Sequence, residues 1–87
     1  MICKKITIKG RVHGVGFRYS AEIRAKELGI SGYVKNTSEG VEIVAYGDDL
    51  SVKQLCDWCK GGPSLSRIDS IDIEKIDELP AGFKVVY

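Results

Sequence analysis

The spacing of the apolar residues alternates along the chain between a period of two and a period near 3.6, and the order of these patterns most constrains the fold. Residues 2–12 alternate between apolar and polar side chains, which predicts a half-buried strand. Residues 18–28 follow helical spacing instead, and Gly29 stands where a helix would end. A glycine-rich stretch from Gly10 to Gly16 lies between them. The chain is therefore predicted to begin as strand, loop and helix.

Two short strands and a second helix are predicted next. Residues 32–36 and 41–46 flank a short run of turn-forming residues, as in a hairpin. Asp48 or Asp49 is expected to cap a helix that continues to about Lys60. One side of this helix is apolar and is expected to face the core: Val52, Leu55, Cys56 and Cys59.

The C-terminal part is expected to hold a strand over residues 66–77 and a short final strand over 83–87. The isoleucines of the longer strand do not share one parity, which predicts a bulge or a change of exposed face. The complete order predicts an α+β fold of the ferredoxin-like split βαβ type (βαββαβ plus a short C-terminal strand), with two helices on one face of an antiparallel sheet. Glu42 and Glu74 are expected on its solvated open face.

Length and charge limit the possible functions. The 87 residues leave room for one domain, expected to span 1–87. The formal net charge of +1 is too small to predict nucleic-acid binding. No apolar run is long enough to cross a bilayer, and the N-terminus lacks the apolar stretch of a secretory signal, so a cytoplasmic protein without membrane contact is expected. The small size and the lack of an obvious apolar patch predict a monomer.

The three cysteines, Cys3, Cys56 and Cys59, are an odd number, which predicts reduced thiols. Cys56 and Cys59 form a C-x-x-C motif. Redox forms of this motif place their thiols at a helix start or in an exposed loop. Here both fall within a predicted helix on its apolar side, so packed thiols are the preferred interpretation.

The segment from Gly10 to Arg18 carries most of the chemical information. Gly14 and Gly16 allow positive φ, so that successive backbone N–H groups can turn inward and form a concave anion site. A helix that starts directly afterwards adds its free amides and the positive end of its dipole. Arg18 falls at that helix start, where its charge is unfavourable unless an anion is bound, and its guanidinium suits phosphate oxygens. The alternative is a tight turn with a solvated arginine, because neither a Walker A nor a dinucleotide fingerprint matches.

Asn36 is the second candidate. A hairpin position alone explains an asparagine, because this residue tolerates turn conformations. In the predicted fold, however, the ends of the first two strands are expected to lie close enough for a loop and a strand end to share a site. The amide of Asn36 offers both a donor and an acceptor, so it could hold a water beside a phosphate bound by Arg18.

The same residues carry a resemblance to a known family. The sequence of residues 10–18, GRVHGVGFR, resembles the acylphosphatase signature, whose usual form is Gly-x-Val-Gln-Gly-Val-x-Phe-Arg. The sequence of residues 32–36, GYVKN, resembles the second family motif, and Gly47 and Trp58 also stand where the family has similar residues. The likeness spans nearly the whole chain, and its first motif is highly specific.

The resemblance implies hydrolysis of the carboxyl–phosphate bond of a small acyl phosphate. It implies that Arg18 binds the phosphoryl group with nearby backbone amides and that Asn36 orients the attacking water. No cofactor or metal is implied, and no carboxylate lies between Gly10 and Tyr19 to hold magnesium. The position of His13, usually Gln, contributes mainly its backbone in the family pattern, so activity is expected to persist. The amides in question belong to His13, Gly14, Val15, Gly16, Phe17 and Arg18.

Two binding modules compete with the enzyme interpretation. A non-catalytic phosphate-binding module of the same fold would use Arg18 and its loop in the same way, but it would not need Asn36. An RNA-recognition domain shares the order of strands and helices, but it would carry aromatic-rich strand motifs, and residues 41–46 contain a single aromatic residue.

Overall fold

The computed structural model describes residues 1–12, 16–61 and 67–76. Every element bound in these ranges lies within one residue of the bound predicted from the sequence. The predicted final strand over 83–87 lies outside the described residues. The elements are β1 (Ile2–Arg11), α1 (Phe17–Glu27), β2 (Ser31–Asn36), β3 (Gly40–Gly47), α2 (Asp49–Gly61) and β4 (Arg67–Ile76).

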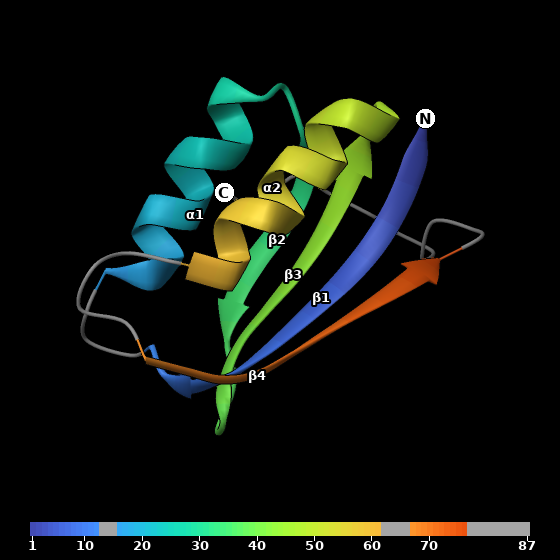
Figure 1. Cartoon of the computed structure of the whole chain (residues 1–87). Helices are drawn as coiled ribbons and strands as arrows, with labels where there is room; N and C mark the ends of the chain where they lie inside the picture. The colour runs from blue at the N-terminus through green and yellow to red at the C-terminus, as the bar shows by residue number, and fades with distance from the viewer. Residues whose placement is uncertain (13–15, 62–66, 77–87) are drawn as a thin grey trace.

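The described strands form one sheet in the order β2-β3-β1-β4, and all three neighbouring pairs are antiparallel. Both helices cover the same face of this sheet (Figure 1). The predicted ferredoxin-like α+β arrangement is therefore confirmed. β1 and β2 are each antiparallel to β3, which lies between them. They therefore run parallel to each other, and their C-terminal ends lie at the same end of the sheet.

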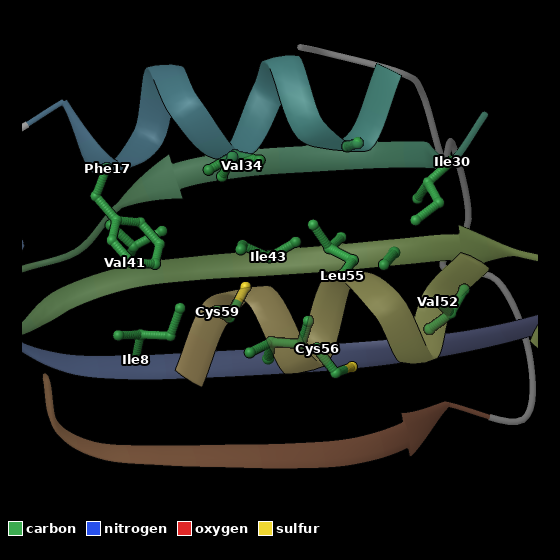
Figure 2. Close-up of a cluster of buried hydrophobic side chains, with 14 of the residues drawn as sticks. Ile8, Phe17, Ile30, Val34, Val41, Ile43, Val52, Leu55, Cys56 and Cys59 are labelled. Carbon is green, nitrogen blue, oxygen red and sulfur yellow. The ribbon is translucent and has the colours of Figure 1, made fainter. Parts of the chain in front are cut away.

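The core lies between the sheet and the two helices. All four residues of the predicted apolar side of α2 are buried, and so are Ala21 and Ala25 of α1, whose small side chains let that helix approach the sheet closely. Figure 2 shows Phe17 and Val41 at one end of this core and Val52 at the other. The first residue of α1 is thus anchored in the core, close to the loop that the sequence singles out.

The three cysteines are free thiols, as predicted, and all three are buried; the burial was predicted for Cys56 and Cys59 on the apolar side of α2. Burial raises the pKa of the Cys59 thiol to about 12 and also raises the pKa values of Cys3 and Cys56. Their thiolate forms are therefore scarce at neutral pH, and thiolates are the nucleophilic and metal-binding forms. The C-x-x-C motif of α2 is a packing feature of the core.

The predicted irregularity in β4 is a bulge. β4 pairs regularly with β1 as far as Ser70, and the register then shifts opposite the Lys9–Gly10 step. The shift carries Asp69 out of register and lets Ile68 pack against the core. Gly10, opposite the bulge, has φ 144°, a backbone conformation that residues with a side chain rarely adopt. The bulge therefore sets the path of the chain just before it enters the loop.

The start of α2 resolves which aspartate caps the helix. The Oδ1 atom of Asp48 accepts a hydrogen bond from the backbone N–H of Ser51 at 3.0 Å, and Oδ2 accepts one from the Ser51 hydroxyl at 2.9 Å. These contacts satisfy one of the otherwise free amides at the helix start. Asp48 is the cap, and Asp49 is the first helical residue.

Candidate active site

The helix α1 begins without a capping side chain. Its N-cap is Gly16, with φ 76° and ψ 17°, and no side chain among the described residues hydrogen-bonds to the cap position. The first helical hydrogen bond runs from the N–H of Ser20 to the carbonyl of Gly16 at 2.9 Å. The amides of the first turn are therefore left for another partner, and the positive end of the helix dipole favours an anion there. His13, Gly14 and Val15 lie outside the described residues.

Arg18 is the second residue of α1, as the sequence predicts. Its side chain is 55% exposed, and its Nε atom lies 3.8 Å from an Oε1 oxygen of Glu22, one turn further along the helix. Such an exposed pair contributes little stability, so the guanidinium can turn toward a ligand at small cost. Nothing acidic occupies the first turn, so the positive charge of Arg18 faces the positive end of the dipole without compensation from that turn.

Asn36 is the last residue of β2 and is exposed. It is in register with Val41 of β3, which is in register with Ile8 near the end of β1. Because Asn36 is two residues beyond the buried Val34, its side chain lies on the face of the sheet that the helices cover. The end of β2, where Asn36 stands, and the start of α1 thus lie at the same end of the sheet and on the same face of it (Figure 1), although β3 lies between β2 and β1.

The turn from β2 to β3 is tied to the end of β1. The N–H of Thr37 donates to the carbonyl of Gly40 at 2.8 Å, and the N–H of Gly40 donates to the hydroxyl of Thr37 at 3.0 Å. The N–H of Gly10 in turn donates to the carbonyl of Glu39 at 3.1 Å. These hydrogen bonds link the turn after Asn36 to the strand that leads into the loop. The strand that ends at Asn36 and the strand that leads into the loop are therefore joined by hydrogen bonds at this end of the sheet.

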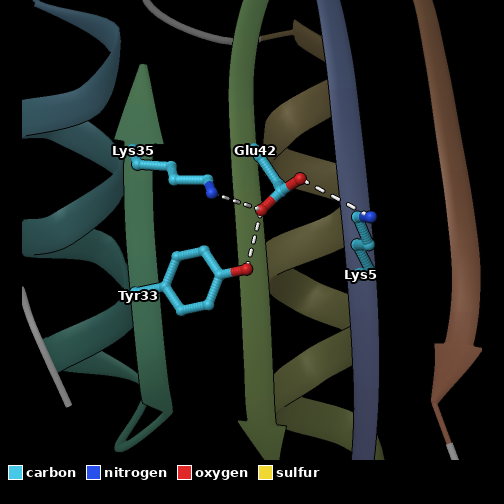
Figure 3. Close-up of polar contacts among 4 residues, drawn as sticks. All are labelled: Lys5, Tyr33, Lys35 and Glu42. Atoms are coloured by element: carbon cyan, nitrogen blue, oxygen red, sulfur yellow. Dashed lines mark hydrogen bonds and ion pairs between the residues drawn. The ribbon is translucent and has the colours of Figure 1, made fainter. Parts of the chain in front are cut away.

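Glu42 corrects one expectation. It lies on the open face as predicted, but it is not solvated: its side chain is only 16% exposed. The Tyr33 hydroxyl donates a 2.7 Å hydrogen bond to its Oε2, and the Nζ atoms of Lys35 and Lys5 lie 3.4 and 3.5 Å from its oxygens (Figure 3). This cluster joins β2, β3 and β1 on the face opposite the helices. Part of this contact could have been found in the sequence, because two strands over 32–36 and 41–46 joined by a four-residue turn would pair Lys35 with Glu42, as the structure does.

The cluster perturbs both titrating partners. Partial burial, the hydrogen bond to Glu42 and the charge of that carboxylate raise the pKa of Tyr33 to about 12. Partial burial alone would raise the pKa of Glu42, but the hydrogen bond from Tyr33 and the charges of Lys35 and Lys5 outweigh it and hold that pKa below its ordinary value. Both shifts favour the pair as drawn, a neutral tyrosine donating to a charged carboxylate.

Replacing Glu42 by glutamine is expected to lower the free energy of unfolding by about 1 kcal/mol at neutral pH, because the charge-assisted contacts are lost. A depressed folded-state pKa contributes stability that is complete above the ordinary value of 4.5 and is lost as the pH falls through the folded pKa. The difference in the free energy of unfolding between wild type and Glu42→Gln, measured in urea, should therefore shrink as the pH is lowered below 4.5 and through the folded-state pKa. The exposed Glu74→Gln is the control and should show little difference; a Glu42→Gln difference independent of pH would contradict the assignment.

Other features do not form sites within the described part of the chain. No three residues of the kinds that bind metals (His, Cys, Asp, Glu) gather there as a metal site. In the same residues, no helix is long and apolar enough to span a membrane. A cleft with a volume of about 280 Å³ is lined by residues of α1 and by Trp58 of α2.

Comparison with known proteins identifies consistent relatives. The family model for acylphosphatase matches residues 4–85. An acylphosphatase of Vibrio parahaemolyticus is 37% identical over 86 residues, which cover 97% of this chain and 96% of that protein. One from Photobacterium profundum is 43% identical over 77 residues, covering 87% of this chain and 86% of that protein. The crystal structure of acylphosphatase from Bacillus subtilis matches with a TM-score of 0.87 and 33% identity over 100% of both chains.

Proposed function

The chain belongs to the acylphosphatase family, and from this premise we propose that Arg18 and the first amides of α1 bind the phosphoryl group while Asn36 orients the attacking water. The enzyme hydrolyses the carboxyl–phosphate bond of acyl phosphates and releases a carboxylate and inorganic phosphate. One observation carries the proposal for the residues: the uncapped start of α1, with Arg18 in it, lies at the same end and on the same face of the sheet as Asn36. The backbone amides of His13, Gly14 and Val15 are proposed to complete the phosphate site.

The chemistry requires few groups. The water oxygen forms a bond to phosphorus as the bond from phosphorus to the acyl oxygen breaks, and the bonding electrons leave with the carboxylate. A carboxylate is a stable anion, so it departs without a general acid. Charge on the equatorial phosphoryl oxygens is stabilised by Arg18 and the helix amides, and the water proton passes to a phosphoryl oxygen of the substrate. Preorganised donors and a positioned water therefore suffice.

The assay that tests this function is the hydrolysis of benzoyl phosphate, with and without excess chelator. We expect turnover that the chelator leaves unchanged, because no step needs a metal ion. The alternative, a non-catalytic phosphate-binding module, predicts inorganic phosphate binding that depends on Arg18 without any turnover. The family relationship and the position of Asn36 favour the enzyme, since holding an anion does not require an amide that orients water.

Replacing Asn36 by alanine is expected to lower kcat by at least about tenfold while KM changes little, because the water loses its orientation but the phosphate site is intact. Asn36 is exposed, so the free energy of unfolding should stay close to that of the wild type. Ser38→Ala, in the exposed turn that follows Asn36, is the matched control and should keep full activity. Normal kcat in Asn36→Ala would remove this residue from the mechanism.

We further propose that residues 1–87 act as one domain, in the cytoplasm, as a monomer that binds neither nucleic acid nor membranes. The three free thiols suit a reducing compartment. The exposed large apolar side chains of the described residues are distributed over several elements and do not suggest one broad interface. Light scattering should give a mass near the 9.6 kDa of one chain. The exposed large apolar residues mentioned above are Met1, Tyr19, Ile23, Leu50 and Ile73.

A further inference from the structure

Trp58 contacts the residue that starts α1. It is the only tryptophan of the chain and lies on α2. The centroid of its ring system is 5.4 Å from that of Phe17, and the planes are tilted by 50°, a favourable arrangement for two aromatic rings. Phe17 is 0% exposed and stands between Gly16 and Arg18, two residues of the proposed phosphate site. The second helix therefore touches that site through one buried ring.

The contact matters because there is open space around Gly16 in the described part of the chain. A Cβ atom placed on Gly16 would meet nothing within 4 Å in the described structure, and its φ of 76° is one that glycine adopts freely. The path of the backbone at this point must be set by its neighbours. On the helical side that neighbour is Phe17, whose own amide belongs to the first turn. Restricting the Phe17 ring therefore restricts the amides around Gly16.

Phe17 also reaches the other half of the site. Its side chain and that of Val41 belong to the same buried cluster, and Figure 2 shows both at the same end of it. Val41 is the register partner of Asn36. Trp58 packs on Phe17 from α2, and it also lines the cleft described above together with residues of α1. A change in the Phe17 ring would consequently be felt at the phosphate amides and at the strand pair that carries Asn36.

We propose that Trp58 is a positioning residue for acyl phosphate hydrolysis, which by packing on Phe17 holds the amides of residues 16–18 and the base of Arg18 in the geometry that binds phosphate. The proposal rests on the proposed function of Arg18. It assigns to α2 a role in the reaction besides its contribution to the core. Small displacements of preorganised donors cost much activity, so the role is measurable.

The test compares Trp58→Ala and Trp58→Phe with Val52→Ala. Val52 lies on α2 as well; it is fully buried where Trp58 is partly buried, and it lies at the opposite end of the core, near Gly47 and Ile30 (Figure 2). Well below the unfolding transition, we expect Trp58→Ala to lower kcat/KM about tenfold and to weaken competitive inhibition by inorganic phosphate. Trp58→Phe should restore most of both properties, because the contact with Phe17 remains aromatic. Val52→Ala should lose stability and keep its kinetic constants.

An equal kcat/KM and phosphate inhibition constant for Trp58→Ala and Val52→Ala would overturn the proposal. If Trp58→Ala does not fold, Trp58→Leu takes its place and should show the same losses to a smaller extent. A second readout needs no variant at position 58: the emission of Trp58 should change on titration with inorganic phosphate, and the change should vanish in Arg18→Ala. Full activity of Arg18→Ala would instead refute the proposed role of Arg18, on which this proposal rests, so the two failures are distinguishable.

Discussion

Arg18→Ala is expected to lower kcat/KM for an acyl phosphate by a factor of several hundred, equivalent to about 3–4 kcal/mol of transition-state stabilisation. The guanidinium is proposed to stabilise the negative charge that develops on the equatorial phosphoryl oxygens, and water can replace the guanidinium only poorly. The side chain is 55% exposed and its pairing with Glu22 is long, so the free energy of unfolding should change little. Steady-state kinetics on benzoyl phosphate, together with urea unfolding of the same preparation, separates the two effects.

Two variants make the Arg18 result specific. Lys26→Ala removes one positive charge from the other end of α1 and should leave kcat/KM unchanged. Arg18→Lys keeps the charge but loses the planar fork that can bond two phosphoryl oxygens at once, so it should recover only part of the activity. An equal loss in Lys26→Ala would mean that the net charge of the helix matters and that Arg18 has no special place.

Gly10→Ala is expected to be the most destabilising of these substitutions, lowering the free energy of unfolding by about 3 kcal/mol or more. A Cβ atom at this position would overlap the carbonyl oxygen of Arg67 and approach the amide nitrogen of Asp69 to 2.9 Å. These are backbone atoms of the paired strand, so they cannot move aside as a flexible side chain would. The φ of 144° adds strain for any residue with a side chain. Chemical denaturation followed by circular dichroism measures the loss.

Gly61→Ala is the matched control for this prediction. Gly61 is the last residue of α2, has no positive φ, and a Cβ there would meet nothing within 4 Å of the described structure. Alanine favours helix over glycine, so this variant should be unchanged or slightly more stable. If Gly10→Ala proved as stable as Gly61→Ala, the bulge would be able to rearrange at no cost in free energy. The bulge would then not fix the path of the chain before the loop.

The features that could be predicted from the sequence depend on local patterns. The apolar side of α2, with Leu55 and Cys59, follows from helical spacing, because burial of one helix face repeats every three to four residues. The position of Arg18 at a helix start follows from the glycines and the periodicity around it. The location of Arg18 and Asn36 at the same end of the sheet follows from the order of strands and helices, since parallel strands end at the same side of a sheet.

Contacts that join distant segments could not be predicted in this way. The environment of Glu42 needs the register of β1 against β3, which places Lys5 within reach and which no single segment specifies. The contact between Trp58 and Phe17 depends on how the two helices approach each other, and spacing within either helix does not determine that. The roles of Arg18 and Asn36, and of the amides of residues 13–15, remain predictions that the kinetic experiments decide.

The placement of β3 between β1 and β2 also has a consequence for the stage of folding at which the enzyme becomes active. The strand that leads toward Arg18 and the strand that ends at Asn36 are not neighbours, and they are brought together only when a segment that follows both in the chain inserts between them. This insertion closes a long loop, which is the slow kind of step in folding. A partly folded chain that already contains β1, α1 and β2 would therefore be inactive. Catalysis should return during refolding no earlier than the insertion of β3, which makes turnover a direct kinetic marker of that step.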